Sequence, residues 1–500
     1  MNVFLVLPIL IPFLTATLSL LAWNNRSLQR IFSIAGTCAL FGASLALFSL
    51  VWLNGIQASQ MGNWPAPFGI TLVADLFSAL MVLLAGLTGL VVVFYSLAAI
   101  DPARESFGFH SLMHFLLMGV CGAFLTGDIF NLYVWFEVLL ISSFVLLQLG
   151  GEKAQLEGAI KYVTINLVSS ALFLTAIAIL YGMVGTLNMA DLAVQLKSID
   201  RPKILTTVSI LFLLAFGIKA AIFPLFFWLP ASYHTPPAPV AAIFAGLLTK
   251  VGVYSLVRVF TLLFAHDLEQ MNQLILAAAV LTMITGILGA LIQNDFRRVL
   301  SFNLVSHIGY MIMGLGLFTP LAIAGTVFYT IHDVIVKTCL FLVGGIVHRL
   351  KGTYKLSKLG GLYNTQPVIA LLFLVPALSL AGVPPFSGFW GKFILVKAGL
   401  DRHQYLIVAV ALVVGLLTLY SMVIIWSEAF WKKSPDENSV VLDLGSSRSW
   451  WLFVLPVAIL ASLMTVIGFF PEPFFDFAKR AAEQLVDPTD YIQTVLGKST

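Results

Sequence analysis

The chain has 500 residues, of which 60% are hydrophobic and only 10% charged, and its mean hydropathy is +0.99. Soluble proteins carry about 25% charged residues, so this composition excludes a soluble domain. The formal net charge of +4 is small for this length and gives no nucleic-acid-binding signature. The composition therefore predicts an all-α polytopic membrane protein.

Apolar runs of about 20 residues, each long enough to cross a bilayer, predict 14 transmembrane helices. Their expected ranges are 3–23, 29–53, 71–98, 109–126, 129–150, 157–184, 204–228, 238–264, 272–293, 300–318, 321–348, 367–400, 404–431 and 450–470. The first run has no basic stretch before it and no small-residue cleavage site, so we expect a retained helix and not a signal peptide. The remaining segments are expected to be an uncharged loop at 54–70, a polar stretch at 432–449 and a polar tail at 471–500 with a short helix at 474–486.

Two of the predicted helices contain a break. The run 367–400 is too long for one straight crossing and contains Gly382-Val383-Pro384-Pro385. The stretch from Leu214 to Trp228, which includes Pro224, resembles the stretch from Leu380 to Trp390, because in both a small-residue segment leads through proline to a Phe-Trp pair. Interrupted helices at corresponding positions of two halves are typical of a transporter's site, although a kink that only improves packing is the alternative.

The orientation follows from the basic residues of the loops. Thirteen lysines and arginines fall in the loops on one side and seven on the other. Because basic loops remain in the cytoplasm, we expect both termini outside the cytoplasm.

Five ionisable residues lie inside the apolar runs. They are Glu137, Lys219, Lys250, Lys337 and Lys392. A charge at the centre of a bilayer costs about 2.5–3.5 kcal/mol on insertion scales, so such residues are candidates for a functional site. All four cations are lysines, which can take up and release a proton when their surroundings change, whereas arginine stays charged. The pattern predicts a pathway for protons.

The glutamate needs a partner if it is to remain ionised. Lys219 is expected at a similar depth on a broken helix, so we predict a Glu137–Lys219 pair. A static salt bridge that only joins helices is the alternative, but buried pairs contribute little net stability compared with hydrophobic residues.

The eleventh predicted helix carries His332, Asp333 and Lys337, of which Asp333 and Lys337 are four residues apart and can pair. Histidine titrates near neutrality, so His332 is a candidate proton carrier, although it could instead bond a backbone carbonyl. His307, in the tenth helix, is a weaker candidate of the same kind.

Other polar residues carry less weight. Asp75 and Asp128 fall near helix ends as caps or as part of a mouth, and Glu428 is near the end of the thirteenth helix. Asp295 and the following arginines are expected to form a turn that anchors helices. The three cysteines, Cys38, Cys121 and Cys339, have no metal spacing and are expected to be small buried residues.

Several motifs together resemble the antiporter-like membrane subunits shared by respiratory complex I, membrane hydrogenases and Mrp-type Na⁺/H⁺ antiporters. The matching stretches cover about residues 70–430 and are Phe136-Glu137, Gly217-Ile-Lys219, Phe223-Pro-Leu-Phe-Phe-Trp-Leu-Pro230, Pro236-Pro-Ala-Pro-Val240, Leu248-Thr-Lys250, Asp295-Phe-Arg-Arg298, Ser306-His307 and Gly382-Val-Pro-Pro-Phe-Ser-Gly388. The lysine at 392 and the short C-terminal segment look most like the D-type subunits of Mrp antiporters.

This resemblance implies a fold and a set of roles. It implies a single membrane domain with helices 1–3 at 1–98, two inverted five-helix repeats at 109–264 and 272–431, helix 14 at 450–470 and the tail at 471–500, with helices 7 and 12 broken. In the family the Glu–Lys pair falls on Glu137 and Lys219, the next lysine on Lys250, and the terminal relay residue on Lys392.

We therefore expect a proton-translocating subunit of a multisubunit Na⁺/H⁺ antiporter in a bacterial cell membrane, with other membrane subunits as partners and with no cofactor or metal. A proton-pumping subunit of a redox complex is the first alternative. An intramembrane enzyme is disfavoured because no HExxH, GxSxG or paired-aspartate motif appears, and a scaffold because so many buried charges would be costly.

Overall fold

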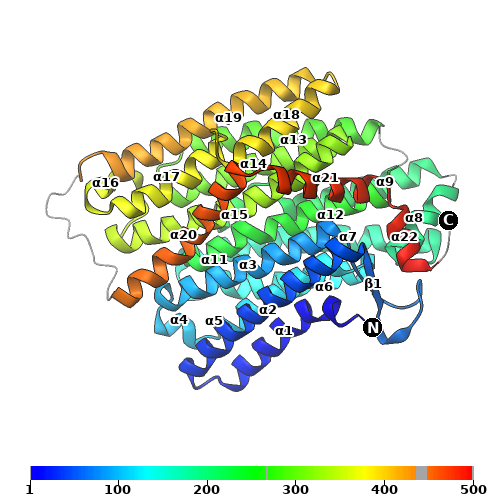
Figure 1. The fold of residues 1–500 in the computed structure, drawn as a ribbon, viewed down its shortest axis with the longest axis horizontal. Coiled ribbons are helices and arrows are strands. Elements are labelled where there is room, and N and C mark those ends of the chain that lie inside the picture. Colours follow the sequence, from blue (N-terminus) through cyan, green and yellow to red (C-terminus); the bar gives the residue numbers. More distant parts are fainter. Residues whose placement is uncertain (1, 200, 266–268, 435–446, 498–500) are drawn as a thin grey trace.

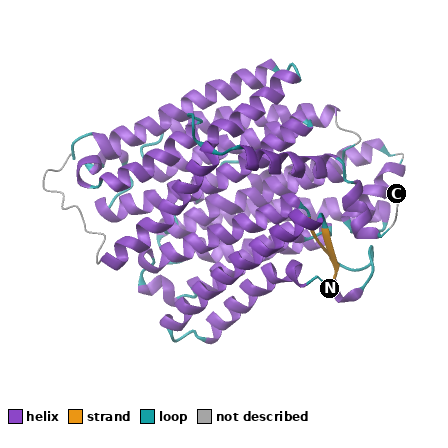
Figure 2. Ribbon diagram, viewed as in Figure 1, coloured by secondary structure: helices purple, strands orange, loops and turns teal. Residues whose placement is uncertain are grey.

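The computed structural model describes residues 2–199, 201–265, 269–434 and 447–497. Long helices run side by side and antiparallel, and a small two-stranded sheet lies at the end of the bundle where α1 begins and α22 ends (Figure 1, Figure 2). Among the described residues, 12 helices are long and apolar enough to cross a membrane, and two shorter apolar helices, Phe109–Leu125 and Pro367–Ala381, accompany them. These helices coincide with the predicted spans, while the count of fourteen crossings and the inverted repeats stay predictions.

The N-terminal part contains three long helices and the small sheet. Its elements are α1 (Val3–Leu21), α2 (Arg26–Asn54), β1 (Gln57–Gln60), η1 (Met61–Asn63), β2 (Thr71–Ala74), α3 (Leu76–Ala99) and α4 (Pro102–Ser106). β1 pairs antiparallel with β2, with Gln57 opposite Ala74. The prediction of helix from residue 71 was therefore wrong. The helix begins later because Asp75 caps it, accepting a hydrogen bond from the Ser78 amide in a capping box.

The next part contains the first broken helix. Its elements are α5 (Phe109–Leu125), α6 (Ile129–Gln148), α7 (Lys153–Val184), α8 (Met189–Gln195), η2 (Leu196–Ser198), α9 (Pro202–Ala220), α10 (Trp228–Ser232), α11 (Ala238–Ile243), η3 (Phe244–Leu248) and α12 (Thr249–Leu262). The predicted break is confirmed, because no regular helix joins α9 to α10 around Pro224. The Trp228 indole donates to the Ile218 carbonyl at 3.0 Å, which satisfies a group freed by the break. The π-helical turn η3 was not predicted.

The following part contains the second broken helix. Its elements are α13 (Glu269–Leu291), α14 (Phe296–Leu317), α15 (Pro320–Lys351), η4 (Leu356–Lys358), α16 (Leu362–Thr365), α17 (Pro367–Ala381), α18 (Ser387–Asp401), α19 (Tyr405–Trp426) and the π-helical turn η5 (Ser427–Trp431). Gly382, in the left-handed conformation with φ of 88°, ends α17, and Pro384 and Pro385 separate it from α18. The predicted break is confirmed here as well.

The C-terminal part continues from the membrane helix into a packed tail. Its elements are α20 (Ser447–Phe469), α21 (Glu472–Val486) and α22 (Thr489–Leu496). The predicted tail helix is confirmed as α21, which packs along α15. Phe477 of α21 contacts Phe48 of α2, with ring centroids 5.3 Å apart. The predicted polar stretch 432–449 lies mostly outside the described residues.

The most deeply buried spans are α15 and the segment Ala238–Leu262, whose apolar windows are fully covered by their neighbours. Cys121 and Cys339 are buried as predicted, but Cys38 is exposed, so that prediction was wrong. The reason is the orientation of α2 about its own axis, which buries small and hydroxyl-bearing side chains such as Ser33 and Thr37 and turns Cys38 outward.

Candidate functional site

A buried ion pair lies at the centre of the bundle. The Lys250 ammonium is 2.6 Å from the Asp333 carboxylate, and neither side chain is exposed. The same ammonium donates to the carbonyl of Ala245 at 2.7 Å, in the π-helical turn just before α12. A π-helical turn interrupts the regular pattern of backbone bonding, and such turns are frequent at functional sites.

The polar contacts continue from this pair to α14. His307 Nδ1 lies 3.7 Å from the second oxygen of Asp333 and 2.6 Å from the Tyr329 hydroxyl. The rings of Tyr310 and Tyr329 stack with centroids 5.3 Å apart, and His307 packs against both. An ammonium, a carboxylate, an imidazole and a phenol therefore form a row in which each group can give or accept a proton.

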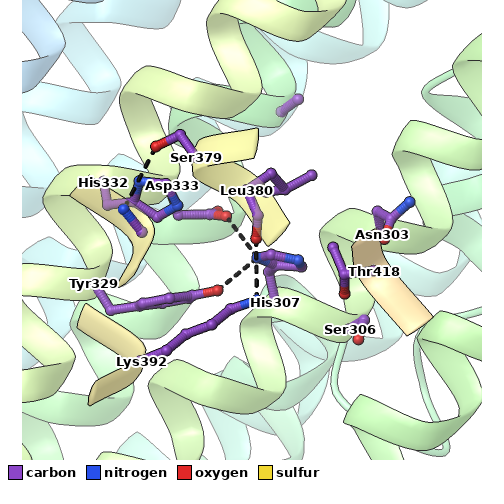
Figure 3. A network of polar contacts seen from close by, with 12 residues as sticks. Asn303, Ser306, His307, Tyr329, His332, Asp333, Ser379, Leu380, Lys392 and Thr418 are labelled. Atoms are coloured by element: carbon purple, nitrogen blue, oxygen red, sulfur yellow. Dashed lines mark hydrogen bonds and ion pairs between the residues drawn. The ribbon is translucent and has the colours of Figure 1, made fainter. Parts of the chain in front are cut away.

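Lys392 lies at the other end of this row. Its ammonium donates to the carbonyls of Leu380 and Ala381, each at 3.0 Å, and lies 5.0 Å from the Tyr310 ring centre. These carbonyls are free because α17 ends there, so the break supplies the lysine's hydrogen-bond partners. Figure 3 shows Lys392 and Leu380 beside His307, with Tyr329 and Asp333 on the same side.

The two remaining predicted residues of α15 differ in their surroundings. His332 Nδ1 forms a hydrogen bond with the Ser387 hydroxyl at 2.9 Å, at the start of α18. That nitrogen therefore does not bond a backbone carbonyl, which was the alternative. Lys337 is fully buried, and its ammonium has no hydrogen-bond partner among the described residues. The expected Asp333–Lys337 pair was wrong, because the Asp333 carboxylate reaches across to Lys250 on a different helix.

The predicted Glu137–Lys219 pair is not in contact. Among the described residues no ion pair joins them, and the Lys219 ammonium donates to the Ser170 hydroxyl at 3.4 Å and lies 5.3 Å from the Phe136 ring centre. Glu137 is only half-buried within this chain, although its run of neighbours is apolar. Gly252 of α12 packs directly against the backbone of α9 at Lys219, which brings α12 and its Lys250 close to α9.

The acidic residues outside the predicted proton pathway mostly cap helices. Asp128 accepts from the Asn131 amide at 2.7 Å, and Asp295 accepts from the amides of Arg297 and Arg298. The prediction of an anchoring turn is supported by Arg297, whose side chain donates to the Pro236 carbonyl at 2.8 Å. Glu428, partly exposed, pairs with Lys432.

Sequence reasoning missed a buried arginine. Arg258 of α12 lies 2.5 Å from Asp75 and over the ring of Tyr491 in α22, at 5.3 Å. The sequence pattern did not indicate it, because Arg258 lies near the end of its helix and not at the centre of an apolar run. Asp75 is therefore both a cap and an ion-pair partner. Among the described residues, no group of three or more His, Cys, Asp or Glu could hold a metal ion.

Comparison with known proteins identifies the family. The model of the family described as "NADH:quinone oxidoreductase/Mrp antiporter, TM" matches residues 126–418. The chain belongs to this family. It is 47% identical, over 99% of its length and 100% of the relative, to the D-type subunit of the Na⁺/H⁺ antiporter of Alkalihalophilus pseudofirmus. It is 42% identical, with the same coverage, to the corresponding D-type subunit of Bacillus subtilis.

A solved structure agrees with this membership. The chain resembles a chain in the structure of the Mrp complex from Dietzia sp., with a TM-score of 0.90 and 31% identity, over 99% of this chain and 100% of that one. The resemblance to the D-type subunits of Mrp antiporters that the motifs indicated is thus confirmed.

Proposed function

We propose that the chain is the proton-translocating membrane subunit of a multisubunit Na⁺/H⁺ antiporter, lying in a bacterial plasma membrane with both termini outside the cytoplasm. The observation that carries this proposal is the row from Lys250 through Asp333, His307 and Tyr329 towards Lys392. The proposed relay consists of Glu137, Lys219, Lys250, His307, His332, Lys337 and Lys392, with breaks at Pro224, Pro384 and Pro385.

The relay works through charge. A proton that arrives beside a second positive group raises the energy of both, by ~2 kcal/mol for unit charges about 8 Å apart at an effective dielectric constant of about 20. Among the described residues the Lys219 ammonium has one hydrogen-bond partner, a hydroxyl at 3.4 Å, so a change in its distance to Glu137 would alter its charge state. Re-forming that pair would push the proton towards Lys250 and onward to Lys392. Coupled to sodium movement, this proton flow would drive sodium efflux.

Two surface features support partner subunits in the membrane. Glu137 is half-buried within this chain, and one of its carboxylate oxygens is buried without a hydrogen-bond partner among the described residues, so a charge there requires protein or water beside it. The helix α21 begins a few residues after Gly468, which contacts Trp390 beside the α17–α18 break, and reaches the start of α3 at Gln484.

By these contacts α21 runs along the bundle from the level of the α17–α18 break to the end where α3 begins. From Glu472 to Gln484 the helix rises ~18 Å, at 1.5 Å per residue. Glu472, Asp476 and Arg480 are exposed on this chain along that length. Because exposure of such charges to lipid tails is costly, the face fits a neighbouring membrane subunit with polar groups.

The test is sodium-dependent proton movement in everted membrane vesicles that contain the complete complex. We expect Lys250→Met, Lys392→Met and Glu137→Ala to abolish the exchange while the complex still assembles. The control is Lys397→Met, an exposed lysine of α18 close to Lys392 in sequence. Normal exchange in an assembled Lys250→Met complex would refute the proposed role.

The same assay separates the antiporter from a redox-driven pump. An antiporter dissipates a proton gradient only when sodium is added, with no electron donor present. A subunit of a redox complex would move protons on addition of reductant and would ignore sodium.

A further inference from the structure

A second polar cluster lies away from the central row, where α1, α2 and α5 pack together. The part of α2 that faces this interface carries Gln29, Ser33 and Thr37, all buried. A membrane helix that turns hydroxyl and amide groups inward must satisfy them with other polar groups or with water. The three-helix interface is therefore polar inside.

Two histidines of α5 face this interface. His110 and His114 are four residues apart, so they lie on one face of the helix, and both are buried. His114 Nε2 is 3.0 Å from the hydroxyl of Ser33. His110 Nε2 is 2.9 Å from the carboxylate of Glu105, just before α5.

The cluster opens to the surface through Arg30. Its guanidinium makes a two-pronged contact with Glu105, at 2.6 and 2.8 Å, and its side chain is 41% exposed while that of Glu105 is 3% exposed. This end of the bundle is opposite the small sheet, and α4 lies there (Figure 1). The orientation expected from the loops makes it the cytoplasmic end.

Several buried polar atoms on α1, α2 and α5 have no protein partner among the described residues. They are His110 Nδ1, His114 Nδ1, Ser111 Oγ, Gln29 Oε1 and Ser19 Oγ. Buried polar atoms are nearly always hydrogen-bonded, and where no protein group is in reach, ordered water takes that place. Ordered water beside these five atoms on the three adjoining helices would supply their missing partners.

We propose that His110 and His114 form a proton-binding site in a hydrated pocket between α1, α2 and α5, loaded from the surface at Arg30 and Glu105. This proposal rests on the proposed function only in taking the proton as the transported ion. A proton from water binds Nδ1 of His110, and water then carries it to Nδ1 of His114. When His114 releases the proton to water, both rings are neutral again. A neutral imidazole accepts a proton on its unprotonated nitrogen and can release it again, which suits this role.

The charges that face the two histidines are few. Burial would raise the pKa of the Glu105 carboxyl, but hydrogen bonds from His110 and Arg30 outweigh it and lower that pKa to about 2. Glu105 therefore stays ionised and orients His110 without carrying the proton itself. The adjoining α1 has no titratable side chain, and on α3 the phenol of Tyr95 is bonded to the Leu342 carbonyl.

The first experiment measures the pH profile of sodium-dependent exchange in vesicles with the complete complex. We expect His114→Gln and His110→Gln to slow exchange about tenfold at alkaline pH, where protons are scarce, and much less at acidic pH; tenfold corresponds to ~1.4 kcal/mol in the barrier. The control is His348→Gln, at the same end of the bundle but stacked on Tyr354 outside the cluster. A wild-type pH profile in both assembled variants would overturn the proposal.

The second experiment does not depend on transport. Solid-state NMR of the complex with ¹⁵N-labelled histidine is expected to show two imidazoles, identified by their loss in the two variants, that contact water and take up a proton as the pH is lowered through the range of the exchange assay. The same signals are expected in the Lys250→Met complex. If that complex titrates normally while wild-type vesicles show no exchange, the proposed function fails and the site stands.

Imidazoles that have no contact with water and keep one protonation state over this pH range would refute the proposed site. If His110→Gln does not assemble, Ser33→Ala removes only the hydroxyl that contacts His114 and is expected to shift the His114 signal and the pH profile together. An unchanged signal and profile in Ser33→Ala would count against the relay.

Discussion

The ion pair at the centre of the bundle can be tested with Asp333→Asn, which keeps the size of the side chain and removes its charge. In the wild type the Lys250 ammonium lies 2.6 Å from this carboxylate and 2.7 Å from the Ala245 carbonyl, with both side chains fully buried. In the variant, the ammonium faces only a carbonyl and a neutral amide.

The expected magnitude follows from the geometry. At 2.6 Å and an effective dielectric constant of about 20, two unit charges attract each other by ~6 kcal/mol. Most of this attraction offsets the cost of taking both charges out of water, so the net contribution of the intact pair is small. Removing one partner leaves the other charge uncompensated, and we expect the variant to be less stable by about 3–5 kcal/mol.

The control is the double variant with Lys250→Met and Asp333→Leu. Apolar replacements of similar size usually restore the stability of a buried pair. We therefore expect the double variant to recover the unfolding midpoint of the purified complex, followed by intrinsic fluorescence in denaturant, but to show no sodium-dependent proton exchange in vesicles. The single variant is expected to lose both properties.

Two results would refute this reasoning. Exchange at the wild-type rate in the double variant would show that the pair only joins helices. An unchanged unfolding midpoint in Asp333→Asn would show that water or another group already neutralises Lys250.

Three further predictions follow from contacts elsewhere in the bundle. A Cβ added at Gly252 would lie 2.6 Å from a backbone nitrogen of α9, so Gly252→Ala is expected to weaken exchange and assembly, whereas Gly182→Ala, which has open space around it, is expected to leave both unchanged. Arg258→Leu is expected to lower the unfolding midpoint by an amount equivalent to about 3–5 kcal/mol because it leaves Asp75 buried and unpaired, and Asp75→Asn in the same background is expected to recover part of it. Burial and the charge of a nearby arginine lower the pKa of His234 from its usual 6.5 to about 4, so the folded state binds fewer protons than the unfolded chain in that range. Stability is therefore expected to fall as pH drops from about 6.5 to about 4, and His234→Asn should flatten this dependence in denaturant titrations at several pH values. An equal slope in the variant would assign the pH dependence to other groups.

The family resemblance and the positions of the buried charges could be predicted from the sequence because both depend on local features. Apolar runs of bilayer length mark the helices, and a lysine inside such a run stands out without any knowledge of its neighbours. The breaks at Pro224 and Pro384 were equally visible, because proline cannot donate the backbone hydrogen bond that a continuous helix needs. Caps such as Asp295 act on amides two or three residues away, so they too could be read locally.

The small errors arose where burial depends on packing. Cys38 lies in an apolar run, yet it faces outward because α2 buries its hydroxyl-bearing face against α1, α3 and α5. The same face carries Ser33, which contacts His114, and no period of apolar residues predicts it. Residues 71–74 are apolar enough for a helix, but pairing with β1 makes them a strand.

The sequence by itself determined which helices are broken and which positions carry charge at membrane depth. Only the tertiary structure decided how these charges are neutralised. Asp333 has a lysine four residues away on its own helix, but its carboxylate pairs with Lys250, because α15 is enclosed by other helices and the nearest ammonium comes from one of them. Spacing along a helix gives the groups that could meet, whereas the packing of several helices determines the ones that do.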